Sequence, residues 1–371
     1  RDEDLRADRQ PEFTQVDEEL SFVTADDIMT LNEGLIAKVW KEILDVEVQT
    51  PFRRMKWDDA MDTYGSDKPD TRFGMEMQNV TDIFKNTAFV PFANVIAEGG
   101  TIRAINAKGL AELLTRKTID KLVDVAKTYG AKGMAYTRIT ADAVSSSFEK
   151  NLTEEEKNAL HTALNAEVGD VLLLVSDAKR VTACTALGQV RLEIGRRANL
   201  MDPKQFNFLW VTDFPLFEYS EEEGRWVAMH HPFTMPTADS LDKVETDQGS
   251  CYADAYDIVL NGVELGGGSI RVNDPVLQDR MFKALGFTEE KARASFGFLM
   301  DAYRYGAPPH GGMAYGLDRM VMLMLGRDSI RDVIAFPKVQ NASELMSGAP
   351  DVVDEKQLRD LSIAYVPQEK N

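Results

Sequence analysis

Two carboxylates and an arginine are grouped in one short stretch of the chain. Asp257 and Glu264 flank Asn261-Gly262, and Arg271 follows seven residues after Glu264. Asn-Gly between two apolar runs is the strongest short signal for a β-hairpin, so we expect Asp257 and Glu264 to lie close together on antiparallel strands. Carboxylates in this arrangement can share a hard cation such as Mg²⁺. A surface pair is the alternative, but both residues adjoin apolar residues, which favours a site.

A second group lies where a glycine-rich segment leads into a helix. Gly311-Gly312 and Gly316 precede Arg319. The backbone N–H groups at the start of a helix and an arginine fork both attract anions such as phosphate. The order of residues is not that of a P-loop, GxxxxGK[ST].

Two histidines are adjacent, His230 and His231, in a chain that has only 4. A single histidine is more often a satisfied core residue than a ligand. Neighbouring residues at the end of a strand point to opposite faces, so we expect at least one of the two to face a cavity or solvent.

The chain opens on a charged run that contains Arg1, Asp2, Glu3, Asp4, Arg6, Arg9, Gln10 and Glu12. By its pattern alone, such a run is a solvated surface. It begins abruptly with Arg1, and we therefore interpret the chain as part of a longer protein.

The element after this run is a helix that begins with a capping box, Thr24 and Asp27. Its apolar residues at helical spacing predict a buried face of Ile28, Leu31, Leu35, Val39 and Ile43. Residues 57–75 are rich in Gly, Pro, Asp and Lys and predict a loop.

The middle of the chain, 75–203, predicts a separate α+β module. Short strands at 89–97, 133–139 and 171–176 alternate with amphipathic helices, one of which begins with a second capping box, Thr153 and Glu156. The module has almost no convergent polar residues, and we interpret it as an inserted domain without chemistry of its own.

Strands return after Pro203, and consecutive hairpins predict an antiparallel sheet. This pattern excludes a Rossmann or P-loop architecture, which needs parallel strands with helical crossovers.

Composition argues against one class of partner. The net charge is -19, the opposite of what is expected for a nucleic-acid-binding protein. Two basic clusters, Arg53-Arg54 with Lys56 and Arg196-Arg197, could face a phosphate backbone, although solvated surface charge is the simpler interpretation of each. No apolar run is long enough to cross a membrane, and two cysteines without a metal-binding spacing suit the reducing cytosol.

The motifs together resemble one family. Residues 1–15 and 311–319 are similar to the second and third signature motifs of the class II aminoacyl-tRNA synthetases, in their bacterial aspartyl form. Residues 210–218, 230–234 and 256–271 look like the same subgroup, and the middle module is similar to the GAD-like domain inserted in it. The resemblance covers the whole chain and implies an α+β fold. It divides the chain into a first catalytic part (1–74), the inserted domain (75–203) and a second catalytic part (204–371).

The resemblance implies ligation of L-aspartate to tRNA(Asp) through an aspartyl-adenylate, with ATP and Mg²⁺ as cofactors, in a cytoplasmic homodimer. Whether tRNA(Asn) is a second substrate stays open. The catalytic residues would be Arg1, Glu3 and Arg319, and the metal ligands Asp257 and Glu264. ATP would be bound by Arg1, Asp2, Glu3, Gln10, Glu264, Gly316, Leu317, Asp318 and Arg319. Aspartate would be bound by Arg1, Gln15, Asp17, His230, His231 and Arg271.

By the same resemblance, the first signature motif, the loop that closes over aspartate and the anticodon-binding domain are missing, so we expect this fragment alone to form the adenylate poorly. The alternative is an ATP-dependent amide-forming enzyme of the asparagine-synthetase kind, without tRNA, on the same sheet. The inserted module and the aspartyl form of the second motif count against it.

Overall fold

A computed structural model of the chain describes residues 9–339 and 341–366. The predicted ATP-binding residues Arg1, Asp2 and Glu3 lie outside these described residues. The chain forms two compact units, Asp17–Ala314 and a smaller one made of Arg1–Val16 with Tyr315–Asn371. Each unit is described by itself.

The larger unit contains a six-stranded sheet in the order β1-β13-β12-β11-β8-β2. The strands are β1 (Gln15–Ser21), β13 (His310–Gly316), β12 (Val263–Ile270), β11 (Tyr252–Leu260), β8 (Phe208–Pro215) and β2 (Arg53–Lys56). β11 pairs antiparallel with β12 and with β8, whereas β2 runs parallel to β8. The predicted hairpin is confirmed, since Asn261 and Gly262 join β11 to β12 with φ of 54° and 88°. The predicted antiparallel sheet flanked by helices is confirmed, with β2 as the exception.

Helix α1 (Ala25–Leu44) covers one face of this sheet, and its predicted capping box is confirmed. The Trp40 ring meets Phe208 edge-on, with 5.0 Å between ring centroids, and Trp210 Nε1 donates to Glu33 Oε1 at 3.0 Å. The predicted buried face is confirmed at Ile28 but was wrong at Leu31, Leu35 and Ile43, which are exposed. The buried face instead includes Asn32 and Glu33, whose side chains are hydrogen-bonded, so polar residues replace leucines at the sheet.

The opposite face of the sheet carries a second apolar layer. It is formed with α2 (Trp57–Tyr64) and α7 (Pro275–Ala284), which contribute Ala60, Tyr64, Leu277 and Met281. Helix α2 corrects the predicted loop at 57–75. Its eight residues are locally apolar on one side, and the glycines that suggested a loop all follow it.

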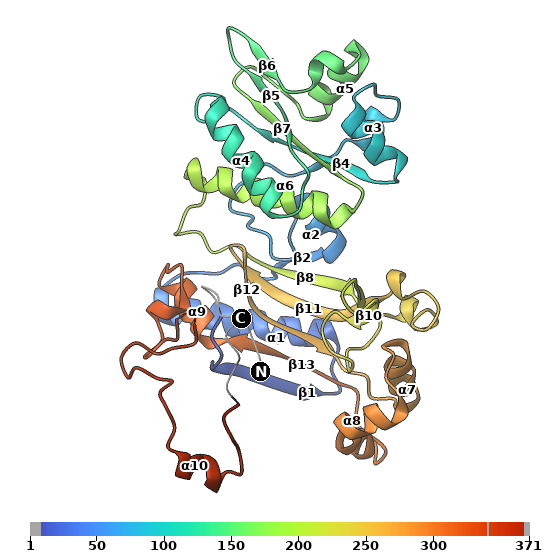
Figure 1. The fold of residues 1–371 in the computed structure, drawn as a ribbon, viewed down its shortest axis with the longest axis vertical. Coiled ribbons are helices and arrows are strands. Elements are labelled where there is room, and N and C mark those ends of the chain that lie inside the picture. Colours follow the sequence, from blue (N-terminus) through green and yellow to red (C-terminus); the bar gives the residue numbers. More distant parts are fainter. Residues whose placement is uncertain (1–8, 340, 367–371) are drawn as a thin grey trace. The chain divides into compact units, whose positions relative to one another are not determined.

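The middle of the chain forms a separate five-stranded sheet in the order β3-β4-β7-β5-β6, covered on both faces (Figure 1). Val171, Leu173 and Val175 of β7 face α4 and α6, and the alternate residues Leu172 and Leu174 face α3 and α5. The strands are β3 (Gln78–Asn79), β4 (Thr101–Ala107), β5 (Ala135–Ile139), β6 (Val144–Ser146) and β7 (Val171–Asp177). The helices are α3 (Val90–Ala97), α4 (Arg116–Thr128), α5 (Glu154–Ala163) and α6 (Arg180–Arg197).

Helix α3 corrects the strand predicted at 89–97. A short continuous apolar run fits a buried strand or a buried helix equally well, and here Pro91 occupies the first turn of a helix, where proline is tolerated. The strands predicted at 133–139 and 171–176 and the capping box of α5 are confirmed.

The remaining elements lie near the sheet ends or in the smaller unit. The larger unit also contains the hairpin β9 (Phe217–Ser220) and β10 (Arg225–Ala228) and helix α8 (Glu289–Tyr303). The smaller unit contains α9 (Leu317–Met324) and α10 (Glu355–Asp360). None of the helices in the described part of the chain is long and apolar enough to cross a membrane.

Candidate functional site

The pairing register of β11 shows which predicted site residues point to the same face of the six-stranded sheet. Trp210 points toward α1 and pairs with Ile258, so the neighbouring Asp257 points to the opposite face. The residue across from Asp257 is Gly267, and Ser269 and Arg271 follow at alternate positions on that face. These residues lie beside the apolar layer formed with α2 and α7, on the face away from α1, and come from separate motifs of the sequence. We call this group of polar residues the polar face.

Asp257 and Glu264 lie on the hairpin where a cation was predicted. A Cβ on Gly267 would lie 2.2 Å from Asp257 Oδ1, so the carboxylate occupies space that only glycine leaves open. Glu264 pairs with Val259, two residues after Asp257, beyond a bulge in the ladder. Mg²⁺ is usually held by one or two carboxylates plus phosphate oxygens and water, so this donor set fits it. Within the described ranges, no cluster of three or more His, Cys, Asp or Glu suggests a closed metal site.

Arg271 forms several hydrogen bonds on the polar face. Its Nε donates to Glu19 Oε1 at 3.0 Å and its Nη2 to Glu19 Oε2 at 3.2 Å. Its Nη1 donates to Ser269 Oγ at 2.5 Å and to His231 Nε2 at 2.9 Å. The Arg271 backbone N–H donates to the carbonyl of His310 at 3.0 Å, which ties this residue to β13. The guanidinium is thus held in place by several polar partners, and a fixed arginine fork suits recognition of a carboxylate.

The two histidines occupy different surroundings. His231 contacts Arg271, whereas the ring of His230 meets the Phe214 ring edge-on at 5.0 Å between centroids. Burial lowers the pKa of His230, and the negative charges of Glu264 and Asp67 partly oppose this effect.

Glu19 and Ser269 were not among the predicted site residues, although both bond Arg271. A signal for Glu19 was present in the sequence. Asp17 and Glu19 alternate along β1, so a strand that presents Asp17 to a ligand also presents Glu19.

Most of the predicted ATP-binding residues that the structure describes belong to the smaller unit. Gly316 ends β13, and Leu317, Asp318 and Arg319 form the first turn of α9. Gln10 is buried and exchanges two hydrogen bonds with the backbone of Lys338, at 3.0 and 2.8 Å. Gln15 is the first residue of β1.

Carboxylates of the chain itself pair with most residues of the two basic clusters considered for tRNA. Arg54 is paired with Asp26, and Lys56 Nζ lies 2.9 Å from Asp213. Arg196 and Arg197 both pair with Glu193, at 3.0 and 2.7 Å. These contacts favour the interpretation of both clusters as paired surface charge.

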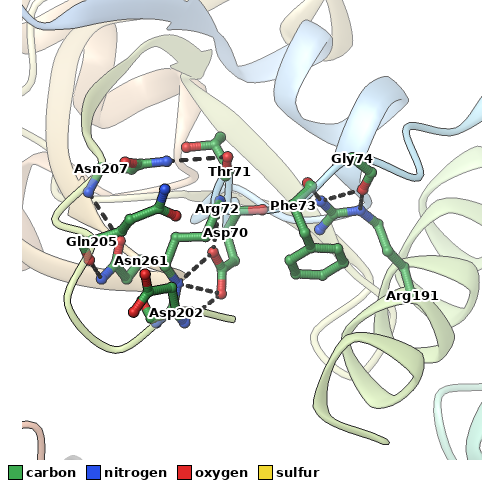
Figure 2. A network of polar contacts seen from close by, with 10 residues as sticks. All are labelled: Asp70, Thr71, Arg72, Phe73, Gly74, Arg191, Asp202, Gln205, Asn207 and Asn261. Atoms are coloured by element: carbon green, nitrogen blue, oxygen red, sulfur yellow. Dashed lines mark hydrogen bonds and ion pairs between the residues drawn. The ribbon is translucent and has the colours of Figure 1, made fainter. Parts of the chain in front are cut away.

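A buried polar network connects the turn of the β11–β12 hairpin to the inserted sheet through residues 70–74 (Figure 2). Arg191 of α6 donates from Nη2 to the carbonyls of Phe73, Gly74 and Asp70, at 2.6, 2.8 and 3.1 Å. Asp70 binds Arg72 at 2.6 Å, and its Cβ would lie 3.3 Å from a Cβ on Gly262. The hairpin that carries Asp257 and Glu264 is therefore packed against the connection to the inserted sheet.

Further hydrogen bonds hold the other side of this connection. Asn207 Nδ2 donates to the carbonyl of Thr71 at 3.1 Å, and the Asn207 backbone N–H donates to Asn261 Oδ1 at 3.0 Å (Figure 2). Asn261 Nδ2 in turn donates to the carbonyl of Gln205 at 2.6 Å. Both chain segments that lead to and from the inserted sheet thus meet at the hairpin turn.

The sequence of the chain matches a protein family and is similar to known proteins. The family model of tRNA synthetases class II (D, K and N) matches residues 1–340. The chain is 58% identical over 369 residues to "Aspartate--tRNA ligase" of Ruminiclostridium cellulolyticum, covering 99% of the chain and 62% of that protein. It is 57% identical over 365 residues to "Aspartate--tRNA(Asp/Asn) ligase" of Lachnoclostridium phytofermentans, covering 98% and 61%. The chain thus spans about three fifths of the length of these relatives. Among solved structures, the aspartyl tRNA synthetase of Entamoeba histolytica matches at 16% identity with a TM-score of 0.42, covering 91% of the chain and 45% of that protein.

Proposed function

The chain belongs to the class II tRNA synthetases (D, K and N), and we propose that it is the catalytic portion of an enzyme that attaches L-aspartate to tRNA. The aspartate α-carboxylate attacks the α-phosphorus of ATP, pyrophosphate leaves, and the terminal ribose hydroxyl of the tRNA then takes the aspartyl group from AMP. The printed names of the relatives support this choice of amino acid and include tRNA(Asn) as a second acceptor.

The observation that carries the proposal is the arginine on the polar face. Aspartate, lysine and asparagine differ in presenting a carboxylate, an ammonium or a carboxamide. The Arg271 guanidinium repels an ammonium and leaves an N–H group facing the NH₂ of a carboxamide, whereas a carboxylate accepts from both prongs of the fork. Among the three amino acids of this family, Arg271 therefore supports aspartate as the substrate.

We propose the remaining roles from the resemblance of the motifs. Asp257 and Glu264 would hold Mg²⁺, which supplies positive charge to phosphate oxygens when bound. Asp17 and Gln15 would accept hydrogen bonds from the amino group of aspartate, and His230 and His231 would line the pocket for its side chain. Arg1, Asp2, Glu3, Gln10 and the segment Gly316, Leu317, Asp318 and Arg319 would bind ATP.

No residue in this scheme acts as a nucleophile, because the substrate carboxylate itself attacks phosphorus. The protein contributes positioning and electrostatic stabilisation of the charge that develops on the phosphate oxygens. We also propose that the whole protein works as a homodimer in the cytoplasm, where ATP and tRNA are available.

The test is amino-acid-dependent exchange of pyrophosphate into ATP by a protein that contains this chain together with the remaining length found in its relatives. We expect exchange with aspartate and much less with asparagine or lysine, followed by charging of tRNA(Asp). Charging assays with tRNA(Asp) and tRNA(Asn) separate the two acceptor ranges. Aspartate-dependent ATP cleavage that yields asparagine from ammonia, with neither tRNA charged, would contradict the proposal.

A further inference from the structure

The donors of Arg271 are almost fully engaged. A guanidinium has five N–H groups. Those of Nε and Nη2 reach both oxygens of Glu19, and Nη1 reaches Ser269 and His231. Four of the five are therefore engaged by partners from the chain, and a ligand carboxylate that requires two of them must displace one partner.

The three partners are not equally easy to displace. The bonds to Glu19 join two opposite charges through two parallel contacts, whereas Ser269 and His231 offer single neutral acceptors. All four bonds are charge-assisted through the arginine, but the two-point contact with Glu19 adds the attraction of a carboxylate charge and is therefore the hardest to displace. A ligand carboxylate is thus expected to replace a neutral partner at Nη1 and to leave the Glu19 contact in place.

The position of the Glu19 carboxylate is built into the sheet. A Cβ on Gly312 would lie 2.2 Å from Glu19 Oε2 and 2.8 Å from its Cδ, so the carboxylate lies in the space that a side chain at 312 would fill. The preceding residue, Glu18, points to the other face and binds Asn32 of α1. The missing side chain on β13 and the alternation of β1 together direct Glu19 toward Arg271.

We propose that Glu19 is a positioning residue that acts through Arg271. It holds the Nε–Nη2 edge of the guanidinium, so that the Nη1–Nη2 edge is presented to the side-chain carboxylate of the amino acid. This inference rests on the proposed function, because it deepens the role of Arg271 in choosing aspartate. Glu19 therefore contributes to specificity without touching the substrate.

Two substitutions separate position from charge. Glu19→Asp keeps the negative charge but is shorter by one methylene, so its carboxylate cannot reach both Arg271 nitrogens from the same strand position. Glu19→Gln keeps the length, but its NH₂ group opposes the N–H groups of Arg271. If Glu19 positions Arg271, both variants bind aspartate at least about tenfold more weakly, which corresponds to the loss of about one charge-assisted hydrogen bond.

The matched control is Glu18→Gln, on the same strand but on the α1 face, which should leave aspartate binding unchanged. Aspartate affinity is measured by calorimetry, and KM for aspartate, asparagine and ATP by pyrophosphate exchange, in the full-length protein. We expect the preference for aspartate over asparagine to fall in both Glu19 variants while KM for ATP stays within about twofold. A purely structural defect would change both substrates together.

The outcomes distinguish this inference from the proposed function. Wild-type protein that neither binds aspartate nor catalyses exchange overturns both. Wild-type protein that binds aspartate, with a Glu19→Asp variant of equal affinity and selectivity, overturns only the positioning role. Tighter aspartate binding by Glu19→Gln also overturns it, because Glu19 would then be competing with the ligand for Arg271.

Discussion

The guanidinium of Arg191 lies over the ring of Phe73, 3.9 Å from its centroid, although 118 residues separate them in the chain. A second ring, that of Tyr64, lies 4.9 Å from the same guanidinium. Arg191 is 1% exposed, and burial lowers its pKa to about 10. A charge so deeply buried is tolerated because backbone carbonyls and aromatic faces surround it.

Replacing Arg191 with Met should destabilise the protein by about 3 kcal/mol. The change removes the donor of the carbonyls of Asp70, Phe73 and Gly74, of which the first two are in buried hydrogen bonds, and each unsatisfied buried group costs about 1–3 kcal/mol. Denaturant unfolding measures the loss. Arg196→Met, which removes an exposed pair with Glu193 from the same helix, is the control and should change stability by less than about 0.5 kcal/mol. Equal effects of the two substitutions would contradict the role of Arg191.

Replacing residues 75–202 with a short linker should lower the melting temperature but keep pyrophosphate exchange in the full-length protein. The deletion removes Arg180, which bonds Asp58 and Asp62 of α2, and Gly188, whose Cα would lie 3.0 Å from a Cβ on Gly65. The residues of the polar face all lie outside the deleted range. Exchange is measured below the melting temperature of the variant. Loss of exchange in a variant that remains folded would make the inserted module part of the catalytic apparatus.

His230→Gln should reduce the loss of stability that the wild type shows on acidification. Burial lowers the pKa of His230 in the folded state below its ordinary value of 6.5. As the pH falls through about 6.5, the unfolded chain therefore takes up a proton that the folded chain does not, and stability falls by at most about 1.4 kcal/mol per pH unit. Urea unfolding of both proteins between about pH 7.5 and 5 tests this. If the free energies of unfolding of the two proteins change in parallel over this pH range, His230 does not contribute to the pH dependence of stability.

Arg271→Leu should remove most of the selectivity for aspartate over asparagine. The wild-type fork is expected to favour the carboxylate by about 10⁴-fold, because a carboxamide leaves one donor unpaired. Arg271→Lys should rescue only partly, since it restores charge without the planar fork. The measurement is kcat/KM for both amino acids in pyrophosphate exchange. A Leu variant that still prefers aspartate would assign the discrimination to another residue, such as His231.

Arg319→Ala should weaken ATP binding by about 1.5–3 kcal/mol, the contribution of one hydrogen bond to a charged group, with little change for aspartate. Calorimetry with each ligand separates the two effects. Arg327→Ala, which changes an exposed arginine just after the same helix, is the control. Weaker aspartate binding at unchanged ATP affinity would contradict the assignment of Arg319.

Local sequence signals determined several parts of the structure. The Asn261-Gly262 turn and the capping boxes at Thr24 and Thr153 were predictable, because each depends on neighbouring residues whose geometry is set by the backbone. The motifs around Arg271 and Arg319 also indicated the family. Local signals failed where an apolar run of intermediate length allowed both helix and strand, as at 89–97, and where a short helix preceded a glycine-rich segment, as at 57–64.

Only the tertiary structure decided which side chains meet. Glu19 and Arg271 are 252 residues apart, and no local pattern relates them. They meet because β1 and β12 both pair with β13 and because Gly312 leaves room for the Glu19 carboxylate. The buried face of α1 likewise depends on its partners on the sheet, since Trp210 donates a hydrogen bond to Glu33 and Asn32 donates one to Glu18, which allows both polar side chains of α1 to be buried.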